Sequence, residues 1–382
     1  MKANSTWKTC FQHSFFKNQK PKWIFMYRSL QSGRAIAALL VVLFHLGGAI
    51  ASEQYFGFEE FSIPFSFGDS GVEFFFVLSG FIIFYVHNID LGDSRNIGSY
   101  IYKRMIRIYP AYIIIFSGVY LAAILIPATR DTVPHDFSAI IKALLLIPQD
   151  KDVTGGTGAP VLGVAWTLQF EMMFYLGFAL AILRKALGFI LISVYLLGLS
   201  IGLKDFAFPL SFIFSEYVLL FLMGILIAYL LSFKMISRSN PFIFAVTGLT
   251  IYSLNALAKI NGLGIKPEIQ TIMYGASCSI IVLSMILYER DGKIFLNNRF
   301  SQLLGSASYS LYLIHYPLIS ILCKISILLG LKDYGYAGAM MSYIFILFAC
   351  IAVSIVFHVV IEKPVGRWLK SLWTRNILQP SS

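Results

Sequence analysis

The stretch Arg34 to Ile50, RAIAALLVVLFHLGGAI, predicts a membrane-crossing helix with an arginine at its start and one histidine deep inside. Eleven helical steps separate Arg34 from His45, which at about 1.5 Å per residue places the imidazole roughly 16 Å further along the helix. An ionisable side chain at such depth is a candidate functional group. A second interpretation stays open, in which Arg34 reaches back to the lipid headgroups and His45 packs against a neighbouring helix.

The same apolar pattern recurs along the whole chain. Hydrophobic residues make up 58% of the sequence and charged residues only 13%, whereas soluble proteins have roughly a quarter charged residues. The mean hydropathy is +0.75. Apolar segments of about 20 residues, long enough to span a bilayer, lie near 35–52, 70–88, 108–127, 162–183, 187–203, 210–232, 242–258, 269–288, 303–329 and 337–361. We therefore predict an all-α polytopic membrane protein with about ten transmembrane helices.

The net charge of +11 is explained by orientation in the membrane. If the helices alternate in direction from a cytoplasmic N-terminus, 22 of the 30 Lys and Arg residues fall in cytoplasmic segments. The first outer loop has four acidic residues and no basic one. This asymmetry follows the positive-inside rule and predicts that both termini are cytoplasmic. The basic excess therefore indicates contact with anionic membrane lipids and gives no support for nucleic-acid binding.

Three regions follow from this topology. Residues 1–28 are predicted to be a basic cytoplasmic tail on the inner leaflet, residues 29–368 the transmembrane domain, and residues 369–382 a second cytoplasmic tail. The first helix ends Ala49-Ile50-Ala51, which resembles a signal-peptidase site. Because the polar segment before it is long for a signal peptide, we expect an uncleaved helix. The four cysteines lack metal-ligand spacing and are interpreted as packing residues.

The second helix carries a carboxylate in the block GVEFFFVLSGF, residues 71–81. Glu73 lies about one turn inside this helix, where burial of a carboxylate is costly. Ser79 and Gly80 are small residues that allow another helix to approach closely. Packing alone accounts for this small pair, but Glu73 is a candidate site residue.

An Arg-x-x-Arg motif, Arg104 and Arg107, precedes the third apolar segment. Residues three apart share a helix face, so the two guanidinium groups can bind one phosphate together. The alternative is a pair of anchors to lipid headgroups. The motif lies on the predicted cytoplasmic side, where nucleotide-bearing donors are found.

The long outer segment, residues 128–161, contains a short apolar stretch and a glycine-rich stretch. The apolar stretch, residues 140–147, is too short to span and is expected to be re-entrant or interfacial. The glycines at 155–158 lack the Lys and Ser/Thr of a P-loop, so they predict no nucleotide cradle. The next helix begins at Trp166 and has a second intramembrane carboxylate, Glu171.

The last two helices add further polar candidates. The ninth contains Tyr309 and His315, with Pro317 placed to kink the helix beside the histidine. The tenth ends Ile361-Glu362-Lys363-Pro364, followed by a basic tail.

Taken together, these blocks resemble the acyltransferase-3 family of bacterial membrane-bound O-acyltransferases, and the exopolysaccharide acetyltransferase branch in particular. The resemblance extends from about residue 30 to residue 367. Six blocks in the family's order carry it: Arg34 with His45, the Gly-Val-Glu-Phe-Phe-Phe-Val-Leu-Ser-Gly-Phe block, Arg104 with Arg107, Trp166 with Glu171, Tyr309 with His315, and Glu362-Lys363-Pro364.

The resemblance implies transfer of an acyl group, usually acetyl, from cytoplasmic acetyl-CoA to a hydroxyl of a glycan or lipid-linked sugar. It implies a multi-pass protein of the bacterial inner membrane that uses no metal and no permanently bound cofactor. By the same resemblance, the Arg34 and His45 pair is essential, and Arg104 and Arg107 contact the donor. A homo-oligomer is compatible with this class.

The chemistry requires a base for the hydroxyl proton and stabilisation of the developing oxyanion. We predict that His45 deprotonates the acceptor or first accepts the acyl group itself. Arg34 and Glu171 complete the predicted catalytic group. The predicted substrate-binding residues are Arg104, Arg107, Glu73, Trp166, Tyr309, His315 and Glu362.

Two other function classes fit a polytopic protein with buried ionisable groups. A transporter or flippase for a lipid-linked glycan is expected to show two related halves, and no internal repeat is visible in the sequence. A non-catalytic membrane scaffold predicts no acetyl-CoA-dependent activity.

Overall fold

A computed structural model describes residues 27–378 except 234, 235 and 237. Most of the predicted N-terminal tail, residues 1–28, therefore lies outside the described residues. The described chain folds into helices joined by short loops, without a β-strand in the described ranges. Nine of its helices are long and apolar enough to cross a membrane, and Lys185–Ser200 is a shorter apolar helix. The prediction of an all-α polytopic membrane protein is confirmed.

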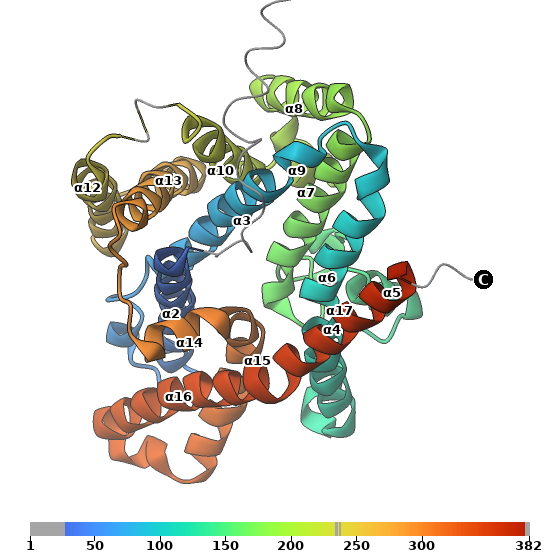
Figure 1. Cartoon of the computed structure of the whole chain (residues 1–382). Helices are drawn as coiled ribbons and strands as arrows, with labels where there is room; N and C mark the ends of the chain where they lie inside the picture. Colours follow the sequence, from blue (N-terminus) through green and yellow to red (C-terminus); the bar gives the residue numbers. More distant parts are fainter. Residues whose placement is uncertain (1–26, 234–235, 237, 379–382) are drawn as a thin grey trace, which may run out of the picture.

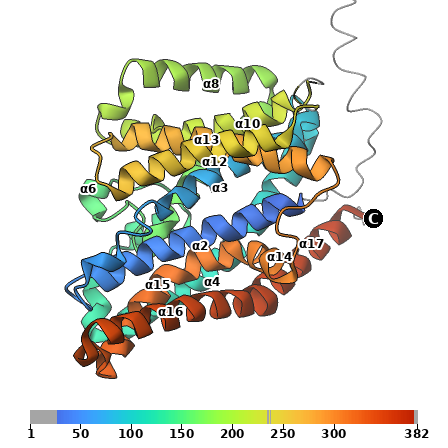
Figure 2. The same ribbon diagram turned by 90° about the vertical axis from the view of Figure 1, so that its left-hand side faces the viewer.

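The helix that carries Arg34 and His45, α2 (Arg28–Ala51), lies near the middle of the bundle (Figure 2). Its neighbours are α3 (Gly71–His87), α13 (Pro267–Arg290), α14 (Arg299–Ser306), α15 (Ser308–Leu328) and α16 (Gly335–Phe357). Long aliphatic residues along one face of α2, Val42, Leu46 and Ile50, are completely buried. The stretch with which the sequence analysis began is therefore a core element of the fold.

The other helices long enough to cross a membrane, together with the shorter α8, flank this core. They are α4 (Ile97–Leu125), α7 (Trp166–Leu183), α8 (Lys185–Ser200), α10 (Tyr217–Leu230) and α12 (Pro241–Ile260). Figure 1 shows α12, α13, α10 and α3 grouped on one side of the bundle, with α4, α7 and α17 (Lys363–Leu378) on the other. Figure 2 shows that the first and last described residues lie at the same end of the bundle.

Helix α3 packs against α10 backbone to backbone because both helices carry glycine at the contact. A Cβ atom on Gly80 would lie 2.0 Å from the carbonyl oxygen of Phe221, and one on Gly224 would lie 2.0 Å from that of Val77. The expectation that Gly80 lets another helix come close is thus confirmed. Its neighbour Ser79 does more than pack, because its Oγ donates a hydrogen bond to Glu171.

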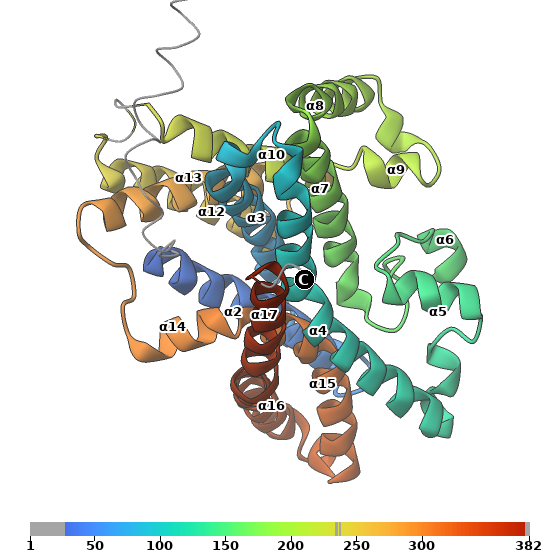
Figure 3. The ribbon, with the colours of Figure 1, turned by 45° about the vertical axis from the view of Figure 1, so that its right-hand side comes forward.

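The segment between α4 and α7 folds back beside α4 (Figure 3). It contains α5 (Phe137–Leu144) and α6 (Lys151–Thr154). The hydroxyl of Tyr112 on α4 donates to the carbonyl of Ala143 at 2.7 Å, and that of Tyr109 donates to Leu145 at 2.9 Å. These bonds hold the short apolar stretch against the middle of α4.

Several helix bounds differ from the apolar segments. Helix α4 begins at Ile97, eleven residues before the apolar segment, so that the Arg-x-x-Arg motif is helical. The predicted ninth helix is divided at Ala307 into α14 and α15. After Phe357 the last long helix continues through one π-helical turn, His358–Glu362, into α17.

Candidate active site

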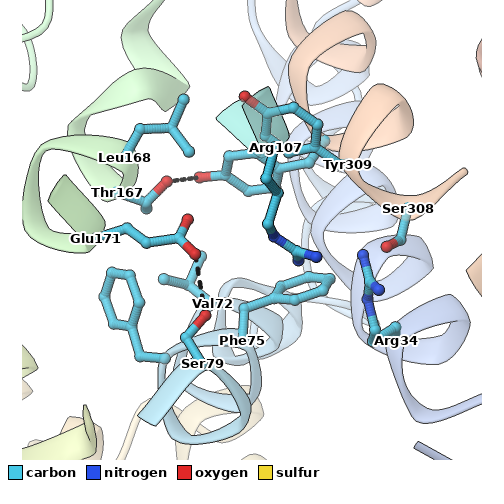
Figure 4. A pocket seen from close by; sticks show the side chains of 12 residues that line it. Arg34, Val72, Phe75, Ser79, Arg107, Thr167, Leu168, Glu171, Ser308 and Tyr309 are labelled. Atoms are coloured by element: carbon cyan, nitrogen blue, oxygen red, sulfur yellow. Dashed lines mark hydrogen bonds between the residues drawn. The ribbon is translucent and has the colours of Figure 1, made fainter. Parts of the chain in front are cut away.

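A cavity with an empty volume of about 490 Å³ lies between α2, α3, α4, α7 and α15. Arg34, Arg107 and Glu171 line it together with hydroxyl and aromatic side chains (Figure 4). With Tyr309, which also lines the cavity, four predicted site residues from four different helices therefore meet in one place.

Within the part of the chain that the structure describes, neither arginine of the cavity has a carboxylate partner. Arg34 is 6% exposed, and its Nη1 donates only a long hydrogen bond of 3.4 Å to Gln31. Arg107 is solvent-exposed although it belongs to an internal wall of the bundle. None of the ion pairs within the described residues includes either arginine. Their free donors make the cavity suitable for an anionic ligand.

The carboxylate of Glu171 is held by two hydroxyl groups. Ser79 Oγ donates to Glu171 Oε1 at 3.1 Å, and the Tyr175 hydroxyl donates to the same oxygen. Figure 4 shows Glu171 and Arg107 entering the cavity from different helices. The opening thus contains two cations and one fixed carboxylate, an arrangement that can bind an anionic group and orient a polar one.

Arg104 does not line the cavity. Its Nη2 donates to His87 Nε2 at 2.9 Å, and His87 Nδ1 donates in turn to Asp90 at 2.7 Å. The guanidinium also lies over the rings of Tyr100 and Tyr175, at 5.6 and 5.7 Å from their centroids. The structure therefore separates the two arginines of the motif: Arg107 faces the cavity and Arg104 is bound within the bundle.

His45 contacts His315 on α15, with 3.3 Å between His45 Nδ1 and His315 Nε2. The Nδ1 atom of each ring lies 3.0 Å from a carbonyl oxygen of its own helix, that of Val41 or of Leu311. Because a carbonyl oxygen only accepts, Nδ1 carries the hydrogen in both rings. The one hydrogen of His45 Nδ1 is then shared between the Val41 carbonyl and the lone pair of His315 Nε2, and His45 Nε2 keeps its own lone pair.

Tyr312 lies between this histidine pair and the cavity. It lines the cavity, and its ring centroid is 5.8 Å from that of His315. Thr167 donates to the Tyr312 hydroxyl at 2.9 Å, and that hydroxyl donates to the carbonyl of Val164 at 3.0 Å. His45 is therefore connected to the cavity through two side chains, His315 and then Tyr312.

The other predicted site residues have separate positions. Tyr309 lines the cavity and donates to the carbonyl of Ile108 at 2.9 Å. Glu362 lies behind it and accepts from Ser310 and, at 2.8 Å, from His358. Trp166 packs against the rings of Phe76, Phe170 and Tyr217. Glu73 faces away from the cavity, and its buried Oε2 has no hydrogen-bond partner within the described ranges.

Three residues that contact the candidate site were not proposed from the sequence. Tyr175 follows Glu171 by four residues and His358 precedes Glu362 by four, so helical spacing was a usable signal for both. The contact of His87 with Arg104 joins two different helices and left no signal in the spacing. Among the described residues, no three His, Cys, Asp or Glu side chains form a group that could hold a metal ion.

Fold and site together define a multi-pass membrane protein with an internal cavity of arginines beside a pair of histidines. Comparison with known sequences identifies the family. A family model described as an acyltransferase domain matches residues 27–359, so the chain belongs to the acyltransferase-3 family and is an acyltransferase.

Individual relatives agree with this assignment. The chain is 28% identical over 312 residues to the exopolysaccharide production protein ExoZ of Rhizobium meliloti (strain 1021), covering 79% of this chain and 91% of that protein. It is 25% identical over 335 residues to a protein named "Putative O-acetyltransferase" of Staphylococcus aureus (strain COL), covering 80% of this chain and 52% of that protein. The chain thus spans about half of the staphylococcal relative. No solved structure matches the chain.

Proposed function

We propose that this protein transfers an acetyl group from acetyl-CoA, bound at the cytoplasmic end of the bundle, to a hydroxyl of a surface glycan or lipid-linked sugar. The observation that carries this proposal is the cavity that brings Arg34, Arg107 and Glu171 together and that Tyr312 and His315 connect to His45. The Rhizobium meliloti relative is named an exopolysaccharide production protein, which supports an exopolysaccharide as the acceptor. The donor is supplied from the cytoplasm, and the basic residues follow the positive-inside pattern. Both support a location in the bacterial inner membrane.

The donor side of the reaction uses the arginines. Coenzyme A is polyanionic, and guanidinium groups bind phosphate oxygens through paired hydrogen bonds. Arg107 is open to solvent and carries no internal ion pair, so it binds the donor directly. Arg34 lies near the start of α2 and binds the same anion or the thioester oxygen. Arg104 adds positive charge one turn nearer the start of α4.

His45 performs the chemistry with its free Nε2 lone pair. In the direct route, Nε2 takes the proton of the acceptor hydroxyl while the sugar oxygen attacks the thioester carbonyl. The C–S bond breaks, and the CoA thiolate leaves and takes up the proton. In the covalent route, Nε2 itself attacks the carbonyl and displaces CoA thiolate. The sugar oxygen then attacks the acyl carbon, the C–N bond to the imidazole breaks, and the hydroxyl proton passes to the CoA thiolate.

Either route needs movement at the boundary between cavity and histidines. Tyr312 and its bonds to Thr167 and Val164 close the cavity on the side of His315. The acetyl group must therefore pass the Tyr312 ring, and rotation of this ring is part of the proposed cycle.

The test replaces His45 in the purified full-length protein. His45→Gln is expected to lower the rate of acetyl transfer by about 10² to 10⁴, the usual contribution of a positioned general base. His135→Gln, on an exposed outer residue, is the matched control and is expected to retain the rate. Thermal unfolding of both variants checks that they are folded. Full activity of a folded His45→Gln protein would disprove the proposal.

The two chemical routes give different results without acceptor. In the covalent route, radiolabelled acetyl from acetyl-CoA stays on the denatured wild-type protein and is absent from His45→Gln. In the direct route, neither protein retains label, although both bind acetyl-CoA. Failure of the wild-type protein to bind acetyl-CoA at all would contradict the donor assignment.

A further inference from the structure

A second set of polar and aromatic side chains surrounds His45 outside the cavity. The ring of Phe44 lies edge-on to His45 with 5.0 Å between centroids, and that of Tyr316 lies edge-on at 5.3 Å. Tyr316 is 49% exposed, and neither Phe44 nor Tyr316 lines the cavity. His45 is thus flanked by two aromatic rings that the donor site does not use.

An ion pair between Asp69 and Lys259 lies beside the Phe44 ring. Lys259 Nζ lies 2.6 and 2.7 Å from the two carboxylate oxygens of Asp69, and it is 5.9 Å from the centroid of the Phe44 ring. A Cβ on Gly68, next to Asp69, would be 3.1 Å from Phe44 Cβ, so this turn packs directly on α2. The pair therefore lies beside Phe44, the residue that precedes His45 on α2.

Both members of the pair are reachable from solvent. Their side chains are 26% exposed for Lys259 and 41% for Asp69. Lys259 is the residue before the last of α12, and Asp69 precedes α3 by two residues, so both lie at helix ends. An ion pair with this exposure adds little to stability. Its presence beside a candidate catalytic histidine calls for a second explanation.

The chemistry of the cluster fits a sugar ring. Aromatic faces with a few fixed polar groups are the usual lining of a small-molecule site. An ammonium group has three donors and a carboxylate has about four acceptor positions, so the pair keeps capacity for further hydrogen bonds. A sugar offers hydroxyl groups to Asp69 and Lys259 and an apolar C–H face to the Tyr316 ring.

We propose that Asp69 and Lys259, together with Tyr316 and Phe44, bind the sugar acceptor and present its hydroxyl to His45. This inference rests on the proposed function and adds the residues that recognise the acceptor. Donor and acceptor then approach His45 from different sides, with Arg34 and Arg107 on one side and the Asp69–Lys259 pair on the other.

The experiment measures O-acetate on the surface glycans of the source strain, with the gene deleted and restored in variant forms. Asp69→Asn and Lys259→Met are expected to lower the restored acetate about tenfold or more, because each loses hydrogen bonds to a charged group. Lys204→Met is the matched control, since Lys204 forms another ion pair between separate segments, 3.8 Å from Glu268. It is expected to restore wild-type acetate.

Two further measurements separate recognition from a structural tether. Purified Asp69→Asn and Lys259→Met are expected to bind radiolabelled acetyl-CoA with wild-type affinity, because the donor cavity is intact. The exchanged variant Asp69→Lys with Lys259→Asp restores an ion pair but reverses its donors and acceptors. It is expected to unfold at the wild-type temperature and still leave the glycan unacetylated.

The outcomes are distinct. If wild-type protein restores acetate and the two single variants restore it equally well, the acceptor assignment is wrong and the proposed function stands. Rescue of acetylation by the exchanged pair, or a parallel loss of acetyl-CoA affinity, would also overturn the acceptor assignment. If gene deletion leaves surface acetate unchanged and wild-type protein fails to bind acetyl-CoA, the proposed function itself fails.

Discussion

At the scale of single residues, Arg104 and Arg107 have the same chemistry and different surroundings. Arg107 reaches the cavity without an ion pair, whereas His87 already accepts a hydrogen bond from Arg104. A guanidinium with free donors gains more from an added phosphate than one whose donors are engaged. We therefore assign most of the donor affinity to Arg107.

The first prediction follows from this difference. Arg107→Gln is expected to raise the KM for acetyl-CoA about ten- to hundredfold, the equivalent of a lost charge-assisted hydrogen bond. Arg104→Gln is expected to raise the KM for acetyl-CoA by a factor several times smaller than Arg107→Gln does. Lys103→Gln, an exposed neighbour on the same helix, serves as the control. Equal effects of all three substitutions would mean that only general positive charge matters.

The second prediction concerns His315, which we propose positions His45. His315→Phe removes the Nε2 acceptor of the His45 Nδ1–H group and is expected to lower kcat about tenfold or more. The KM for acetyl-CoA is expected to stay the same, because His315 lies beyond Tyr312. His315→Gln supplies an amide acceptor and is expected to recover part of kcat. No difference between Phe and Gln would indicate a packing role alone.

Sequence spacing predicted part of the site and missed the rest for a definable reason. Intramembrane ionisable groups are costly, so Arg34, His45 and Glu171 could be selected individually before the fold was known. The contact of His45 with His315 joins residues 270 apart, and periodicity on one helix carries no information about its neighbour. Likewise, which arginine faces the cavity depends on how α4 is rotated against α3.

At the scale of elements, close packing of α3 on α10 fixes the wall that carries Ser79 and Phe75. The glycines at this contact allow the two backbones to touch, as the sequence predicted for Gly80. Other elements could not be delimited by hydropathy. The start of α4 at Ile97 lies in a polar, basic stretch, and the division at Ala307 lies inside an apolar one.

The third prediction tests the α3–α10 contact. Gly80→Ala is expected to lower the thermal unfolding temperature, because overpacking of a close contact costs about 1–3 kcal/mol. Gly118→Ala, at a helical position with no atom within 4 Å of the new Cβ, is the control and is expected to leave that temperature unchanged or raise it. A Gly80→Ala protein as stable as Gly118→Ala would show that the helices separate at little cost.

At the scale of the whole molecule, the number of crossings decides which loops share a side of the membrane. Nine described helices are long enough to span, and α8 has only 16 residues. At about 1.5 Å per residue, α8 measures roughly 24 Å against a hydrocarbon thickness of about 30 Å. With α8 as a tenth crossing both ends of the described chain share one side, which agrees with their common position in Figure 2.

The ion pair between Asp69 and Lys259 supports the same count. Asp69 lies between the first and second crossings, and Lys259 lies at the end of α12. Only if α8 crosses do these two residues reach the same face of the membrane, where their side chains meet at 2.6 Å. The acceptor site that we propose therefore depends on the topology of a helix that is not part of it.

The fourth prediction tests this dependence by cysteine labelling in intact cells. Asp205→Cys, in the loop after α8, is expected to react with a membrane-impermeant maleimide, as is Glu60→Cys in the first outer loop. Lys185→Cys, at the start of α8, is expected to react only after permeabilisation. The three cysteines of the described chain are buried, so wild-type protein sets the background. If Asp205→Cys does not react in intact cells, α8 does not cross the membrane. Lys259 and Asp69 would then lie on opposite faces, which is incompatible with their ion pair and would contradict the ten-helix topology.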